Sequence, residues 1–225
     1  MNTPIAIDDS IREQAIQHLQ QDARLAWLIS QIGDVEFLTD DGGTSADDDF
    51  AFVVGQIIGQ MLSIKASDTI IARLQARCGG LIDVATVLAL NADELRATGI
   101  AQRKAQCILT LATAVAQGQL DFEQLRQSDD KTITAQLTAF HGIGTWTAKM
   151  YLYRLRRLDV LPYEDVIFVS AYRWLYADDT ANAKTIKQHA QSWSPYSSIA
   201  ATYLYTAATS GLTKRVAVPF TSDPV

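Results

Sequence analysis

Residues 137–150 read LTAFHGIGTWTAKM, and this stretch decides how the chain folds. Its two glycines, Gly142 and Gly144, let the backbone turn sharply and keep side chains away from whatever approaches the turn. Ile143, between them, is the apolar residue that we expect to enter the core. The stretch therefore predicts a tight helical hairpin. The first amide groups of its second helix would face outward and form an anion site suited to a phosphate.

The helical period extends from this hairpin over almost the whole chain. Apolar residues recur at steps of three and four, as over residues 108–115, whereas alternating β-branched runs are scarce. Helix-start patterns, such as Asn91 with Glu94 three residues later, and stop glycines separate the segments. We predict about ten helices and no sheet, with one long apolar helix over residues 50–65. The tail after Gly211 is expected to be loosely held.

The composition limits the class of protein. The chain has 225 residues, 48% of them hydrophobic and 20% charged, which is typical of a soluble globular protein and excludes disorder over its whole length. No apolar run reaches the ~18 residues of a membrane span, and residues 1–11 lack the order of a signal peptide. Cys78 and Cys107 are too few for a disulfide framework or a four-cysteine iron–sulfur site. We expect a protein of the cytoplasm with no contact with a membrane.

The net charge of −6 is unevenly placed. Residues 1–60 contain eleven acidic residues and two arginines, whereas residues 61–225 contain 17 basic and 14 acidic residues. The simpler interpretation of the negative net charge is an acidic surface that keeps the protein soluble. Binding, however, depends on the local electrostatic field rather than on the net charge. The second part could carry a basic face for nucleic acid, although such a cluster alone is usually a solvated helix surface. The residues of that predicted face are Arg103, Lys104, Lys149, Arg154, Arg156 and Arg157.

The hairpin and four further segments resemble the helix-hairpin-helix DNA glycosylases, in particular their alkylation-repair branch of the 3-methyladenine DNA glycosylase II type. The hairpin part of the resemblance is FHGIGTWTA, residues 140–148. The other segments, in chain order, are IIGQMLSIKA at 57–66, GIAQRKA at 99–105, LPYED at 161–165 and WSPY at 193–196. Together they extend the resemblance over about residues 11–210. It implies an enzyme of base excision repair that flips alkylated purines, first of all 3-methyladenine, out of DNA and hydrolyses their N-glycosidic bond, leaving an abasic site.

The resemblance also implies an all-α fold of two helical lobes with the active site in the cleft between them. One lobe would span residues 50–158 and contain the helix-hairpin-helix at residues 131–156. The other would join residues 1–49 to residues 159–225 and carry the catalytic residue. Many related glycosylases have an extra N-terminal β-domain. This chain is too short for one and resembles the compact form.

Asp165 falls where the family has its catalytic aspartate. By residue type alone, an aspartate before a helix is more simply an N-cap, worth about 1 kcal/mol. The resemblance reverses that preference, because a carboxylate beside the sugar stabilises the positive charge that develops as the glycosidic bond breaks, and it can orient or deprotonate the attacking water. One carboxylate suffices when the leaving base is already cationic. Glu164 is expected to be solvated.

Trp146, Tyr205 and Met61 match the family's contacts with the extruded base or with the gap that it leaves. Met150 joins them because it lies four residues after Trp146 on the same helix face. Trp146 stands where bifunctional members have an attacking lysine, so the resemblance implies a monofunctional enzyme. Trp146, Met150 and Tyr205 would form the base pocket, where electron-poor alkylated bases stack on aromatic rings. Met61 matches the intercalating position and would be the wedge in DNA. Ordinary core packing is the alternative for each of them.

The resemblance assigns the hairpin two further tasks. Phosphate contacts would come from the amides of Gly142 and Gly144 and the hydroxyl of Thr147. Lys149 would be a further phosphate contact or a surface charge. Family hairpins also hold a monovalent cation, Na+ or K+, on backbone carbonyls that correspond here to Thr138, Phe140 and Ile143. No redox cofactor and no divalent metal is expected. The enzyme would be a monomer, associated with the nucleoid if the source is bacterial. His141 stands where proline is usual, so the loop is less stiff than in the family.

Three alternatives stay open. The chain could be a DNA-binding module that has kept the hairpin and lost catalysis, but Asp165 at the family's position speaks against this. It could be a glycosylase for oxidised or mismatched bases, because pocket shape rather than sequence pattern sets the lesion range. It could be a helical scaffold unrelated to DNA, in which case its affinity for duplexes would show no salt dependence.

Overall fold

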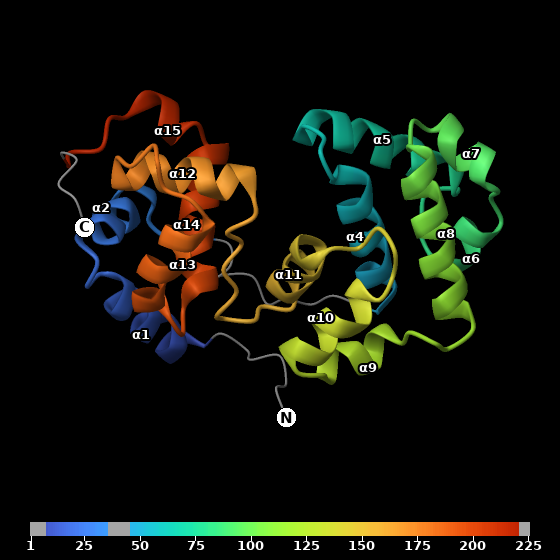
Figure 1. Ribbon diagram of the computed structural model, residues 1–225, viewed down its shortest axis with the longest axis horizontal. Coiled ribbons are helices and arrows are strands. Elements are labelled where there is room, and N and C mark those ends of the chain that lie inside the picture. The colour runs from blue at the N-terminus through green and yellow to red at the C-terminus, as the bar shows by residue number, and fades with distance from the viewer. Residues whose placement is uncertain (1–7, 36–45, 221–225) are drawn as a thin grey trace. The chain divides into compact units, whose positions relative to one another are not determined.

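The computed structural model describes residues 8–35 and 46–220, and over those residues it is helical with no strand (Figure 1). This confirms the predicted all-α class. The described part contains fourteen α-helices rather than about ten, because several helices of only four to seven residues lie between the longer ones. None of the described helices is both long and apolar enough to cross a membrane.

The chain forms two compact units. Unit 1 consists of the described residues from 46 to Leu155, and unit 2 consists of residues 8–35 together with the described residues from Arg156 onward. The helices of unit 1 are α4 (Ala46–Gly59), α5 (Ile64–Arg77), α6 (Val84–Leu88), α7 (Ala92–Ala97), α8 (Gln102–Ala116), α9 (Phe122–Gln127), α10 (Asp130–Thr138) and α11 (Thr145–Arg154). The helices of unit 2 are α1 (Asp9–Leu19), α2 (Ala23–Ile32), α12 (Val166–Tyr176), α13 (Ala183–His189), the 3-10 helix η1 (Ala190–Trp193), α14 (Ser197–Thr209) and α15 (Leu212–Arg215).

Side-chain caps start many of these helices where the sequence indicates. The Asn91 side chain accepts hydrogen bonds from the amides of Asp93 and Glu94, both at 3.0 Å, and the Glu94 carboxylate accepts the Asn91 amide at 2.9 Å. This is the predicted capping box, which satisfies amides that no helical carbonyl can reach. Asp129 caps α10 in the same manner through the Thr132 amide at 2.8 Å.

The predicted single helix over residues 50–65 is wrong, because the chain breaks it after Gly59. The helix α4 ends there and α5 begins at Ile64, with the Ser63 hydroxyl accepting the Ala66 amide at 3.3 Å as its N-cap. Met61, between them, takes the left-handed backbone conformation with a φ of 59°. Apolar residues continue through the break at helical spacing, so the period alone does not reveal it.

A buried carboxylate organises the core of unit 1. Asp49, near the start of α4, is 0% exposed. Its oxygens accept hydrogen bonds from Arg126 Nε at 2.5 Å, Arg154 Nε at 2.9 Å and the Tyr151 hydroxyl at 2.9 Å. Desolvation by burial, followed by the neighbouring Asp49 charge, raises the pKa of Tyr151. The cluster ties α4 to α9 and α11 and satisfies the charge that it buries.

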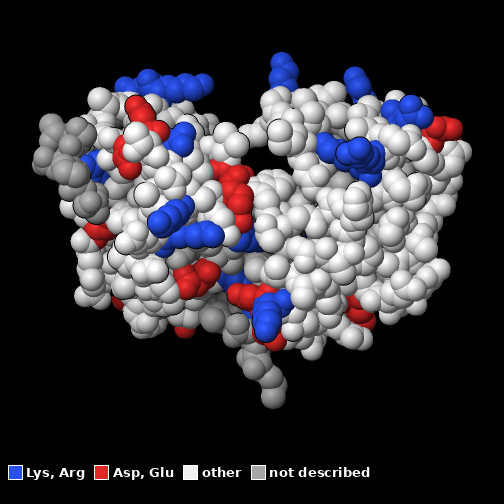
Figure 2. Space-filling view, in the orientation of Figure 1, with Lys and Arg blue, Asp and Glu red and all other residues white. Residues whose placement is uncertain are grey.

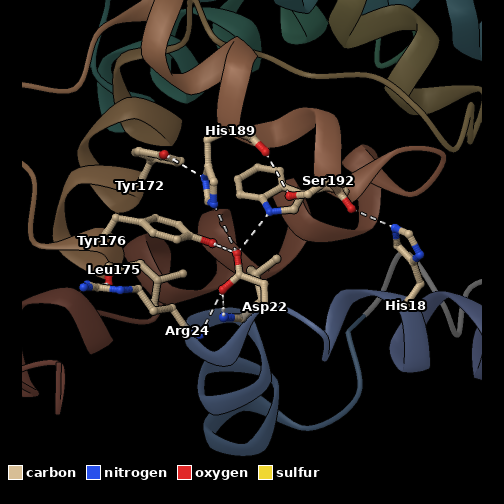
Figure 3. A network of polar contacts seen from close by, with 10 residues as sticks. His18, Asp22, Arg24, Tyr172, Leu175, Tyr176, His189 and Ser192 are labelled. Carbon is tan, nitrogen blue, oxygen red and sulfur yellow. Dashed lines mark hydrogen bonds and ion pairs between the residues drawn. The ribbon is translucent and has the colours of Figure 1, made fainter. Parts of the chain in front are cut away.

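A second polar network lies inside unit 2, where Tyr176 and His189 point towards Asp22 and Tyr172 points towards His189 (Figure 3). Asp22 caps α2, and its Oδ2 accepts the Tyr176 hydroxyl and Trp193 Nε1. His189 Nε2 lies 3.6 Å from the same oxygen, and His189 Nδ1 is 2.8 Å from the Tyr172 hydroxyl. The network joins α2 to α12, α13 and η1.

The prediction that the tail after Gly211 is loosely held is wrong for its described residues, 212–220. Val216 accepts a hydrogen bond from Trp174 Nε1 at 3.1 Å. The Phe220 ring lies 6.1 Å from the Trp27 ring, and the Arg24 guanidinium lies over it at 5.1 Å. Aromatic packing therefore fixes this segment on unit 2, while residues 221–225 lie outside the described residues.

Candidate functional site

The helical hairpin forms where the sequence predicts it, between α10 and α11. The amide of Ile143 donates to the Phe140 carbonyl at 3.0 Å and closes the turn, and the Ile143 side chain is buried. Gly144 is the N-cap of α11 and has no side chain that could accept from the first amides of that helix. The amide end of α11 is therefore of the type that binds anions.

Gly142 is required in the turn for two reasons. Its φ of 103° lies in the region that side chains rarely adopt. A Cβ built at Gly142 would also stand 3.0 Å from the Sγ of Cys107 and 3.1 Å from its Cβ. The helix α8, which carries Cys107, thus packs directly on the hairpin turn.

The predicted wedge lies beside this hairpin within unit 1. Gln60 Nε2 donates to the Gly142 carbonyl at 3.0 Å and to the Thr147 hydroxyl at 3.1 Å. Met61, the next residue, is fully exposed. The alternative that Met61 packs in the core is therefore wrong, and its role as a DNA wedge stays a prediction. Leu62 and Ile64 are also exposed, so Met61 belongs to an apolar tip.

Thr147 has a different place from the one predicted. Its side chain is only 1% exposed and its hydroxyl accepts the Gln60 amide. A phosphate cannot reach a hydroxyl that is buried in this manner, so we assign Thr147 to the packing of the hairpin. Buried hydroxyls in helices commonly take such internal partners.

The other predicted residues of α11 are partly accessible. Trp146, Lys149 and Met150 are all half-buried. Trp146 and Met150 are four residues apart and lie on one face of the helix, as predicted from their spacing. Their contacts with base and phosphate stay predictions.

The predicted cation site fits the residues present. Thr138 is the last residue of α10, where the terminal carbonyls have no helical partner and carry the negative end of the helix dipole. The Phe140 carbonyl accepts the Ile143 amide and keeps a second lone pair. Neutral carbonyl oxygens suit a monovalent cation. Among the described residues there is no cluster of three His, Cys, Asp or Glu side chains for a transition metal.

In unit 2, Asp165 is the N-cap of α12. Its Oδ1 accepts the amides of Ile167 at 2.8 Å and Phe168 at 3.0 Å, and its own amide donates to the Pro162 carbonyl at 2.9 Å. The structure therefore confirms that Asp165 is an N-cap. It does not exclude catalysis, because these bonds hold the carboxylate in one orientation. Glu164 beside it is exposed, as expected.

Tyr205 lies close to this cap within unit 2. Its ring centroid is 6.2 Å from that of Phe168, the residue whose amide Asp165 accepts. The Phe168 ring thus connects Tyr205 on α14 with the start of α12. The predicted cleft joins residues of both units and stays a prediction.

The predicted basic face is smaller than the sequence suggests. Arg154 is paired with the buried Asp49, Arg157 is itself buried, and the Lys104 ammonium donates to backbone carbonyls. The sequence predicts these three cations on a face for DNA. In the structure their charged groups instead contact, or are buried among, other parts of the protein. Arg103 is exposed and keeps its predicted place at the surface.

Other cations are exposed on unit 1. In Figure 2, Lys and Arg side chains gather over the part of the surface that α5 and α7 form. Arg77 of α5 is paired with Glu94, and Arg96 of α7 is paired with Asp93. Exposed ion pairs of this kind contribute little to stability and reduce the local positive field.

The sequence analysis did not predict the contacts that Gln60 makes with the hairpin and that Lys104 makes with the end of α4. Lys104 Nζ donates to the carbonyls of Ile58 at 2.8 Å and Gln60 at 2.6 Å, across the end of α4. Burial lowers the pKa of the Lys104 ammonium. A lysine at the opening of a turn is a common surface residue, so only the contact with a segment more than 40 positions away distinguishes it.

The chain is similar to known DNA repair proteins in sequence and in structure. The family model described as "HhH-GPD superfamily base excision DNA repair protein" matches residues 54–195. A structure of the DNA-3-methyladenine glycosidase of Bacillus halodurans is 33% identical, with a TM-score of 0.73 over 91% of this chain and 92% of that chain. The DNA-3-methyladenine glycosylase 1 of Schizosaccharomyces pombe is 26% identical over 68% of this chain and 69% of its own length. A structure of a 3-methyladenine DNA glycosylase of the same yeast, in complex with abasic DNA, is 22% identical, with a TM-score of 0.77 over 87% of this chain and 97% of that chain.

Proposed function

The chain belongs to the HhH-GPD superfamily of base excision DNA repair proteins, and from this premise we propose that it is a monofunctional DNA glycosylase for alkylated purines. It is similar to proteins named as 3-methyladenine glycosylases in a bacterium and a yeast. Its substrate would be a duplex that contains 3-methyladenine or a related base. Its products would be the free base and an abasic site.

The fixed carboxylate of Asp165 is the observation on which this proposal rests. Two amides hold its Oδ1, so the second oxygen has a defined direction without any movement of the side chain. As the bond between C1′ and the purine nitrogen breaks, its electron pair goes to the cationic base, which leaves neutral. Positive charge then develops on the sugar, where a carboxylate stabilises it. Water adds to C1′, and its proton passes to the carboxylate or to solvent.

The aromatic residues support hydrolysis rather than strand cleavage. Trp146 stands where the resemblance places an attacking lysine in bifunctional members, and an indole cannot form a Schiff base. We assign Trp146 and Tyr205 to stacking on the extruded base, with Met150 beside Trp146 on the same helix face. A cationic purine attracts aromatic faces more strongly than a neutral one does, which would favour alkylated bases.

The hairpin would hold the strand while the base is out. The amide end of α11, with Gly142 and Gly144 before it, would bind a phosphate, and Lys149 would add charge. A Na+ or K+ ion on the carbonyls of Thr138, Phe140 and Ile143 would supply a further positive charge there. Met61 would fill the gap in the stack. We propose a monomer of the cytoplasm as the working form.

One measurement tests the proposal: the free bases released from methylated duplex DNA, identified by mass spectrometry. The wild-type chain should release 3-methyladenine, and Asp165→Asn should release at least 100-fold less, a loss of the size that removal of one electrostatic group causes. Both should bind a duplex with an abasic-site analogue equally well. Glu164→Gln, a neighbouring exposed carboxylate, is the matched control and should stay active.

Three results would contradict the proposal. If wild type and Asp165→Asn bind DNA and are equally inert, the chain is a binding module. If only oxidised or mismatched bases are released, the substrate class is different. If duplex affinity shows no dependence on salt, DNA is not the partner.

A further inference from the structure

Met61 combines a strained backbone with an exposed side chain. Its φ of 59° is rare for a residue with a side chain, and its side chain packs against nothing. Such a conformation persists only where the surroundings determine it. Since the Met61 side chain has no packing of its own, the bonds that impose it must come from the neighbouring residues.

Lys104 supplies those bonds on one side. Its ammonium donates to the carbonyls of Ile58 and Gln60, the residues on either side of the last residue of α4. The end of a helix leaves carbonyls without partners and carries partial negative charge, so an ammonium is well matched to it. The bond to the Gln60 carbonyl fixes the peptide unit that leads directly into Met61.

Gln60 supplies bonds on the other side. Its side-chain amide donates to the Gly142 carbonyl and the Thr147 hydroxyl, both of the hairpin. The residue before the exposed methionine is thus anchored through its main chain to α8 and through its side chain to α11. Its amide nitrogen has two donor hydrogens, and both are used within the unit.

The helix α8 also holds the hairpin itself. Lys104 is in its first turn, and Cys107, one turn later, packs against Gly142. One helix therefore supports both the Met61 turn and the hairpin turn, and Gln60 joins the two turns directly. These contacts link the Met61 turn, the hairpin turn and α8 in a closed loop. Neither turn can therefore shift without the other.

We propose that Lys104 and Gln60 are positioning residues that hold Met61 exposed and in register with the hairpin, so that wedge and phosphate-binding turn meet the duplex as one rigid piece. This rests on the proposed function for its use in base extrusion. Lys104 acts through backbone carbonyls rather than through DNA, which separates it from the cations of a basic face.

The first test needs no enzymatic activity. Amide hydrogen exchange of residues 60–63 is compared in the wild-type chain, in Lys104→Met and in Lys131→Met, which removes an exposed lysine of α10. Loss of a charged hydrogen bond should raise exchange at the Gln60 and Leu62 amides at least about tenfold in Lys104→Met and leave Lys131→Met unchanged. Gln60→Leu should raise it at the same amides. Unchanged exchange in both variants would overturn the proposal.

The second test is a double-mutant cycle on base release under single-turnover conditions. Met61→Ala and Lys104→Met should each slow release about tenfold, and Lys104→Met should add nothing in the Met61→Ala background. A merely destabilising substitution would slow both backgrounds equally. Additive losses of about a hundredfold would show that Lys104 acts independently of the wedge, and would overturn the proposal.

The two tests also separate this proposal from the proposed function. If the wild-type chain releases no base, the glycosylase assignment fails. The exchange result would still decide whether Lys104 and Gln60 hold the Met61 turn.

Discussion

The Sγ of Cys107 occupies the space that a side chain at Gly142 would need, since an added Cβ would lie 3.0 Å from it. We therefore expect Gly142→Ala to lower the free energy of unfolding by roughly 2 kcal/mol or more, from the left-handed backbone and the overpacking together. Chemical denaturation measures this directly.

The neighbouring glycine of the same turn is the control. Gly144 has an ordinary φ of −98° and no atom within 4 Å of an added Cβ, so Gly144→Ala should cost no more than about 1 kcal/mol, from the poorer N-cap alone. Adding Cys107→Ala to Gly142→Ala should recover part of the loss, because it removes the sulfur and leaves the backbone strain. Equal stability of the two alanine variants would contradict the assignment.

The capping role and the proposed catalytic role of Asp165 can be separated by two substitutions. Asparagine caps helices as well as aspartate does, whereas alanine offers no acceptor for the Ile167 and Phe168 amides. Asp165→Asn should keep the wild-type stability, and Asp165→Ala should lose about 1 kcal/mol in thermal or chemical unfolding. Both should lose base release. An active Asp165→Asn would show that the carboxylate serves only as a cap.

Asp49 should be among the least replaceable residues of unit 1. Removing its charge leaves Arg126 and Arg154 largely buried without their partner, which typically costs 3–5 kcal/mol, roughly enough to unfold a marginal domain. We expect Asp49→Asn to unfold at much lower denaturant concentration. Asp68→Asn, an exposed aspartate of α5, should unfold as the wild type does. A mild effect at Asp49 would mean that the arginines find other acceptors.

His189 should make the protein less stable in mild acid. Burial lowers its pKa below the value of 6.5 for a free histidine, and this outweighs the opposite effect of Asp22. The unfolded chain then binds a proton more readily than the folded one, so the free energy of unfolding falls as pH falls from about 6.5. His189→Gln should flatten this slope in denaturation measured from pH 7.5 to 5. Gln188→Ala, the exposed neighbour, should keep it, and a slope that His189→Gln leaves intact would assign the effect elsewhere.

Local patterns predict the parts of this fold that local interactions create. The Gly142 and Gly144 spacing indicates the hairpin, and Asn91 with Glu94 indicates a capped helix, because each motif satisfies its own backbone. The break between α4 and α5 escapes prediction, since bonds from Lys104 and Gln60 fix it from outside the segment. The burial of Thr147 escapes for the same reason. Contacts that join residues 44 or 87 positions apart leave no periodic trace.

The described part of unit 1 is one continuous stretch of chain, whereas unit 2 takes its helices from both ends of the described residues. Tyr203 donates to the Gly33 carbonyl, and Arg24 donates to the Leu175 carbonyl, across 170 and 151 positions. During synthesis α1 and α2 leave the ribosome first, but the helices that they pack against, such as α12 and α14, are synthesised last. Unit 1 can meanwhile acquire its structure, because all of its partners are already present. A ribosome that stalls when residue 155 has left the exit tunnel, but α14 has not, would therefore carry a finished hairpin and an incomplete unit for Asp165.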